Sequence, residues 1–90
     1  MLSKKMAALL NDQVQAETYA SHLYLAMAAY CTVEGFHGFA HWFKIQSKEE
    51  WGHAMKIFDY VLERGGKPAM KGVKAPQLPF APSPTQCNKP

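Results

Sequence analysis

The chain has 90 residues and a net charge of +3 at pH 7, which allows one small domain. Its basic residues form pairs such as Lys4-Lys5 rather than a stripe, and no apolar run approaches the roughly 20 residues of a transmembrane helix, so we expect neither nucleic-acid nor membrane binding. The two distant cysteines, Cys31 and Cys87, form no disulfide framework, and no signal peptide is recognisable, so we expect a cytoplasmic protein.

The first predicted element is a helix over residues 3–31, a segment without glycine or proline. Ser3 is suited to cap its N-terminus because a serine hydroxyl can accept a hydrogen bond from a free backbone N–H. Residues spaced alternately four and three apart form a stripe along one face of this helix. The stripe consists of Met6, Leu10, Gln13, Glu17, Ala20, Tyr24 and Met27.

A short break at residues 32–35, which contains Gly35, predicts that the next helix runs antiparallel to the first. The second helix is predicted over residues 36–64, and Gly65-Gly66 is a strong signal for its end. The same alternation of four and three gives it one stripe as well. This stripe consists of Phe39, Phe43, Gln46, Glu50, His53, Ile57, Tyr60 and Arg64.

Residues 67–90 carry all six prolines and show no helical or strand periodicity. We expect an extended or disordered tail, in which Leu78 and Phe80 could dock on a neighbour. The foldable unit is therefore residues 1–66. Two helices with one apolar stripe each cannot bury those stripes alone, so the predicted fold is all-α: an antiparallel hairpin that dimerises into a four-helix bundle.

Polar residues interrupt both stripes at matching heights. In an antiparallel hairpin Glu17 lies opposite Glu50, and His53 lies one turn along from Glu50. Buried carboxylates are costly unless they are paired or bind a cation, and neither stripe carries Lys or Arg before Arg64. Two carboxylates and one imidazole favour iron or manganese, whereas zinc favours thiolate-rich sites. Zinc can nevertheless also occupy a site of carboxylates and histidine.

A di-iron site in a four-helix bundle needs a Glu from each of two helices and a Glu-x-x-His from each of the other two. One copy of this chain supplies Glu17 and the pair Glu50 and His53, so a twofold dimer would supply the whole set. The alternative is that these residues are hydrogen-bonded polar groups at an interface, without metal. Gln46 and Gln13 lie one turn from the two carboxylates and could orient a ligand or a water molecule.

Several segments together resemble the first two helices of the bacterial non-haem ferritins. Each is weak alone, but the combination is specific and covers roughly residues 1–80. The segments are Met1-Leu-Ser-Lys4, Leu10-Asn-Asp-Gln13, Leu23-Tyr-Leu25, Glu34-Gly-Phe-His-Gly-Phe-Ala40, Glu49-Glu-Trp-Gly-His-Ala54 and Glu63-Arg-Gly-Gly66.

This resemblance implies a ferroxidase site made by Glu17, Glu50 and His53. Glu50 would bridge two irons, and Glu17 and His53 would ligate one of them. The resemblance also implies that Glu49 is an accessory iron ligand. Tyr24 would be the nearby tyrosine that can hydrogen-bond to ligands or donate an electron.

The sequence also departs from that family. Gly52 stands where a methionine would suggest a bacterioferritin haem ligand, so no haem is expected, and a proline-rich segment stands where a third helix should begin. Two-helix chains that resemble encapsulated ferritins dimerise across a di-iron site, and this chain could do likewise. The sequence thus predicts a homo-oligomeric ferroxidase that binds Fe2+ and Fe3+ for iron storage or detoxification. The alternative is a non-enzymatic ferritin half, which oligomerises as a structural module or joins full-length ferritin subunits.

Overall fold

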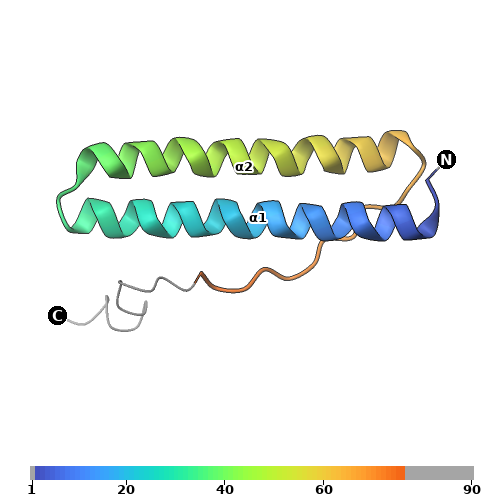
Figure 1. The fold of residues 1–90 in the computed structure, drawn as a ribbon, viewed down its shortest axis with the longest axis horizontal. Helices are drawn as coiled ribbons and strands as arrows, with labels where there is room; N and C mark the ends of the chain where they lie inside the picture. Colours follow the sequence, from blue (N-terminus) through green and yellow to red (C-terminus); the bar gives the residue numbers. More distant parts are fainter. Residues whose placement is uncertain (1, 77–90) are drawn as a thin grey trace.

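In a computed structural model, which describes residues 2–76, the protein forms two antiparallel helices joined by a tight turn (Figure 1). Helix α1 spans Lys4–Val33 and helix α2 spans His37–Glu63. Over the described residues there is no strand, and neither helix is long and apolar enough to cross a membrane. The predicted all-α hairpin is confirmed, with helix ends that differ by one or two residues from those expected.

Both helices end in a glycine turn. Gly35 has a φ of +86° and Gly65 a φ of +78°, a region that side chains other than glycine rarely adopt. After α1, the N–H of Phe36 donates to the carbonyl of Cys31 at 2.7 Å, and the equivalent bond after α2 joins Gly66 to Val61 at 2.8 Å. Because the first such turn is centred on Gly35, α1 continues to Val33, two residues beyond its predicted end.

Small side chains form the contact between the helices. Ala28, Ala40 and Ala54 are each at most 5% exposed, so the two backbones approach closely. Ser21 and Ser47 face each other at this contact, and the hydroxyl of each donates to the backbone carbonyl of the other, at 2.9 and 2.8 Å. These reciprocal bonds satisfy two buried hydroxyls and fix the relative height of the helices.

The two predicted stripes are not the surfaces by which the helices touch. They lie together on one side of the hairpin, which we call the open face, and some of their large apolar side chains are left accessible: Met6 is 46% exposed and Phe39 is 65% exposed, whereas Leu10 and Phe43 are half-buried. Leu9 and Trp42 extend this face and are 55% and 51% exposed. Monomeric proteins rarely leave so much contiguous apolar surface open, and such surfaces commonly mark a contact with another chain or segment. The predicted dimerisation into a four-helix bundle stays a prediction.

The chain after α2 turns back along α1, where it runs beside the helix in Figure 1. Asn11, only 8% exposed, fixes it with both ends of its amide: Nδ2 donates to the carbonyl of Lys67 at 3.2 Å, and Oδ1 accepts from the N–H of Ala69 at 3.1 Å. Gln15 donates to the carbonyl of Gly72 at 2.7 Å, and Lys71 is paired with Asp12.

Residues 67–76, which we call the strap, contain no helix or strand, in agreement with an extended segment. Leu78, Phe80 and Cys87 lie outside the described residues. The division into a hairpin, 1–66, and a tail, 67–90, stays a prediction.

Replacing Asn11 with alanine should release the strap, because two hydrogen bonds to its backbone are lost and the carbonyl of Lys67 loses its donor. We expect a loss of about 1–3 kcal/mol in unfolding free energy and faster proteolysis within residues 67–76. Limited proteolysis followed by mass spectrometry measures the second effect. The Lys71→Ala variant is the control, since its exposed ion pair with Asp12 contributes about 0–1 kcal/mol. Equal cleavage of the two variants would contradict the role of Asn11 in holding the strap.

Candidate metal centre

The structure brings together the three side chains that the sequence predicts to be metal ligands. Glu17 projects from α1, and Glu50 and His53 project from successive turns of α2; one ligand atom from each lies within 4.8 Å of the others. The Nδ1 atom of His53 is 3.6 Å from Oε2 of Glu17 and 3.8 Å from Oε2 of Glu50. The reciprocal serine bonds that fix the height of the helices therefore also set the height of this cluster.

The cluster opens toward the open face. The side chains of Glu17 and Glu50 are only 17% and 21% exposed, whereas that of His53 is 55% exposed. Gln13, one turn before Glu17, donates from its amide to Oε1 of Glu17 at 2.9 Å. With both carboxyls ionised, no hydrogen-bond donor reaches the buried Oε2 atom of Glu17. A buried carboxylate oxygen in this state is costly unless a proton or a cation compensates it.

The two carboxyl groups shift each other's pKa in opposite directions. A hydrogen bond with Glu50 is the main reason that the pKa of Glu17 lies below its ordinary value, against the opposing effect of burial. The same hydrogen bond is the main reason that the pKa of Glu50 is raised, and burial and the charge of Glu17 raise it further. The pair therefore keeps one shared proton up to a higher pH than an isolated glutamate would.

This arrangement has the chemistry of a site for a divalent cation. Two carboxylates and an imidazole are hard and borderline donors that suit first-row metals such as iron and manganese. A cation between Glu17 and Glu50 would replace their shared proton and compensate the Oε2 atom that lacks a donor. One hairpin supplies three ligand side chains, fewer than the six that a di-iron bundle requires.

The other residues that the sequence singles out lie around this cluster. Glu49 is exposed and is not one of the three clustered ligands, although its charge is close enough to raise the pKa of Glu50. Tyr24 is half-buried and stacks on Phe43, with ring centroids 6.0 Å apart. Gln46 is half-buried one turn before Glu50. The proposed roles of Glu49, Tyr24 and Gln46 stay predictions.

A family model for the ferritin-like domain matches residues 7–89 of the chain. The chain belongs to the ferritin-like domain family. Curated relatives agree: the bacterial non-heme ferritins of Staphylococcus epidermidis and Staphylococcus aureus are each 46% identical to it over 81 residues, which cover 90% of this chain and 49% of each relative. The chain thus spans about half the length of the curated relatives that it matches.

Solved structures give the same result for the ferritin-like fold. An open pore ferritin from Archaeoglobus fulgidus superposes with a TM-score of 0.85 and 44% identity, covering 93% of this chain and 51% of that one. An engineered closed form of the ferritin from the same organism gives a TM-score of 0.84 and 45% identity, over 86% of this chain and 47% of that one. The hairpin therefore has the fold of about half of a ferritin four-helix bundle.

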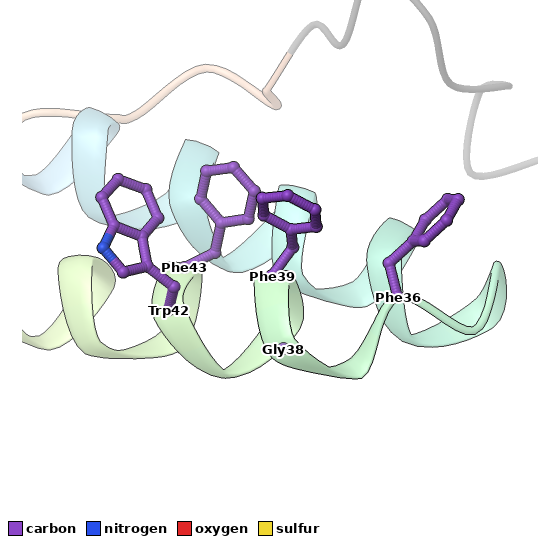
Figure 2. A pocket seen from close by; sticks show the side chains of 5 residues that line it. All are labelled: Phe36, Gly38, Phe39, Trp42 and Phe43. Carbon is purple, nitrogen blue, oxygen red and sulfur yellow. The ribbon is translucent and has the colours of Figure 1, made fainter.

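Near the turn, the open face of this ferritin-like chain is hollowed. Figure 2 shows four aromatic side chains of this region, all on one side of the hairpin. The hollow has a volume of about 730 Å³, and we call it the aromatic hollow; it is lined by Phe36, Gly38, Phe39, Trp42 and Phe43. Sequence patterns do not predict a concave surface, but Phe39 and Phe43 on the second stripe, with Trp42 between them, are the signal from which it could have been inferred.

Proposed function

We propose that this chain binds Fe(II) through Glu17, Glu50 and His53 and oxidises it with dioxygen. The observation that carries the proposal is the convergence of these ligand atoms within 4.8 Å, with a buried carboxylate oxygen of Glu17 that has no donor when both carboxyls are ionised. The names of the matched relatives, bacterial non-heme ferritins, support iron as the metal. Storage or detoxification of iron is the physiological role that we infer from this activity.

In this proposal iron is the substrate. Two Fe(II) ions held side by side each give up one electron, and dioxygen takes both electrons with two protons to form hydrogen peroxide. Glu17 and Glu50 stabilise the Fe(III) product because their negative charges interact more strongly with the ion of higher charge. Glu50 would lie between the two ions, and His53 would complete the coordination of one of them.

The second half of the site comes from a second copy of the chain in this proposal. One hairpin provides three ligand side chains, and a di-iron bundle needs six. The open face next to the cluster supports this inference because it leaves large apolar side chains such as Met6 and Phe39 accessible. A homo-oligomer built on dimers would bury this face and complete the ligand set at once.

An anaerobic titration with Fe(II), followed by exposure to air, tests the proposed activity. We expect Fe(II) to bind in the absence of oxygen and a ferric absorbance to develop after air is admitted. If iron binds to a dimer but is not oxidised, the chain is a binding protein rather than an enzyme. If neither binding nor oxidation occurs, the non-enzymatic oligomerising module becomes the better interpretation.

Metal binding should weaken as the pH is lowered. The raised pKa of Glu50 means that its carboxyl takes up a proton at a higher pH than an ordinary glutamate, and the metal must displace that proton. Affinity should therefore be greatest above the titration range of Glu50 and fall as the pH passes down through it. Calorimetric titration with Mn(II) at several pH values measures this, with circular dichroism at each pH to verify that the hairpin remains folded. An affinity for Mn(II) that does not change with pH would contradict the assignment of Glu50 as a metal ligand.

A further inference from the structure

We propose that residues 78–82 of this chain bind in its own aromatic hollow and cover it before the chain assembles. These residues, Leu78-Pro-Phe-Ala-Pro82, lie outside the described residues, and we call them the docking segment. The proposal goes beyond the proposed function, because it concerns the single chain and involves neither iron nor the ligand cluster.

The aromatic hollow is a concave apolar surface. Its volume of about 730 Å³ is typical of sites that bind a small ligand, and none of its lining residues is charged. Phe43 is held by two ring contacts: it stacks on Tyr24 with centroids 6.0 Å apart, and Trp42 packs edge-on against it at 5.1 Å. Phe36 and Phe39 on the same side of the hairpin are 55% and 65% exposed (Figure 2). The hollow thus offers fixed and accessible aromatic rings to a bound segment.

The strap directs the chain toward this hollow. Asn11 binds the backbone of the strap at Lys67 and Ala69. Gln15, which lies further along α1, binds it at Gly72. In Figure 1 the strap accordingly runs beside α1 from the N-terminal end of that helix toward the turn. The hollow lies near this turn because it is lined by the first residues of α2, so the chain after the strap heads for the end of the hairpin that carries the hollow.

The docking segment is within reach of the hollow. Tyr24, which stacks on Phe43, follows Gln15 by nine residues, or about 14 Å along the axis of α1. Crossing the side of the helix adds about 10 Å, so the direct path is about 17 Å. Leu78 follows Gly72 by six residues, which span about 19 Å at the polyproline II rise of about 3.1 Å per residue. The segment therefore reaches the hollow while the hydrogen bond at Gly72 stays intact.

The sequence of the docking segment suits an aromatic surface. Pro76, Pro79 and Pro82 are spaced three apart, the period of the polyproline II helix, so in that conformation they line one edge. Aromatic-lined grooves bind such segments because the conformation is preformed and little entropy is lost on binding. Leu78 and Phe80 add apolar side chains on either side of Pro79. Neither the segment nor the three residues on each side of it carry a charge, so binding buries no ion.

The tether favours a segment of the same chain over one from a second chain. The strap holds the docking segment within about 20 Å of the hollow, and short tethers give effective concentrations in the millimolar range. A contact that is too weak to join two chains at micromolar concentration is therefore largely formed within one chain. A second copy that covers the open face must first displace the segment, which raises the concentration needed for assembly.

Paramagnetic broadening of NMR signals tests this contact, because the two tryptophans of the chain lie on opposite sides of α2. Trp42 lines the aromatic hollow. Trp51 follows it by nine residues, or about two and a half turns, and borders a separate groove with Lys44 and Lys48. The two tryptophans are almost equally exposed, at 51% and 48%. Trp51 is therefore an internal control for Trp42.

A nitroxide is attached at Ser83→Cys in the full chain, next to the docking segment, and the indole nitrogens are isotopically labelled. The background carries Cys31→Ala and Cys87→Ser, so that the nitroxide has one attachment site. Without iron and at low protein concentration, we expect the indole N–H signal of Trp42 to lose most of its intensity relative to the same sample with reduced nitroxide. The signal of Trp51 should keep its intensity.

Two further variants show whether the apolar side chains of the segment cause the broadening. Adding Leu78→Ser and Phe80→Ser should restore the signal of Trp42. The matched control is Met70→Ser, which removes an apolar side chain that is 61% exposed on the strap and should leave the broadening unchanged. Broadening that persists after both substitutions in the segment would overturn the proposal, and so would equal broadening of both tryptophan signals or of neither.

A mixed sample identifies the chain that supplies the segment. It combines isotope-labelled chains without nitroxide and nitroxide-bearing chains without isotope. Broadening of Trp42 in this mixture would show that the segment comes from another chain, which would also overturn the proposal.

The outcome is independent of the iron chemistry, because no iron is present. A chain that shows the broadening but no ferric absorbance in the separate iron titration keeps this proposal and contradicts the proposed function. A chain that oxidises iron without the broadening supports the proposed function and overturns the docking of the segment.

Discussion

In the Glu50→Gln variant we expect the affinity for iron to fall by at least about 100-fold and the ferric absorbance after exposure to air to disappear. Substituting a residue that only orients a metal ligand typically costs about 10–100-fold in affinity, and Glu50 is proposed to contact both irons directly. In a twofold dimer each substitution is present twice, so both bridging carboxylates are lost together. The anaerobic Fe(II) titration, followed by air, measures both effects.

Glutamine makes this test specific because it keeps the size and shape of the glutamate side chain. The variant should fold at least as well as the parent, since the neutral amide removes the proximity of two carboxyl groups that raises the pKa of Glu50. The matched control is Glu63→Gln, the same change at the exposed end of α2, which should leave iron oxidation unchanged. Glu49→Gln tests the accessory role and should give a partial loss. Normal oxidation by Glu50→Gln would contradict the assignment of the site.

The second large effect concerns the packing that positions the site. Replacing Ala54 with leucine should destabilise the protein by about 1–3 kcal/mol, because three added carbon atoms must enter a contact where the alanine is 0% exposed. For a domain of this size each kcal/mol lowers the melting temperature by about 4–8 °C. Since Ala54 is next to His53, separation of the helices should also weaken iron binding.

Thermal unfolding followed by circular dichroism measures this change at a fixed protein concentration, because dimerisation makes stability depend on concentration. Ala29→Leu is the matched control: it is the same substitution at an exposed position of α1 and should alter stability by no more than about 0.5 kcal/mol. Equal melting temperatures for the two variants would show that the contact at Ala54 is not close-packed.

The helices and the candidate site could be predicted from sequence because each depends on regular spacing. The alternation of four and three from Met6 to Met27 identified one helix, and the turn at Gly35 made it antiparallel to the next. Antiparallel neighbours have a fixed register once the turn is known, so Glu17 opposite Glu50 followed from counting residues. The structure places these two carboxyls together as that register requires.

The contact between the helices was harder to predict because most of its buried residues are small or polar, with Val14 and Val61 as the larger apolar ones. Apolar stripes usually mark the side on which a helix is buried, yet here small residues such as Ala40 and Ala54 fill the contact, and the stripes form the open face. Small residues allow close approach, and the large ones remain for the next layer of the bundle. Ser21 and Ser47 gave no signal in the sequence, because a hydroxyl pair is recognisable only when both helices are positioned.

The strap was predicted only as an extended or disordered segment. Its attachment depends on Asn11, whose partners Lys67 and Ala69 lie more than 50 residues away along the chain. No periodicity links such distant positions. The one available signal was a polar residue three positions before Val14, on the side of α1 that is buried in the hairpin.

In the proposed function, two copies of this chain share one di-iron site. Native mass spectrometry of the full chain, loaded anaerobically with Fe(II), measures subunit number and bound iron together. We predict an even-numbered assembly with one iron per chain, that is, two irons for each pair of hairpins. A monomer, or an assembly that retains no iron under these conditions, would contradict the shared site.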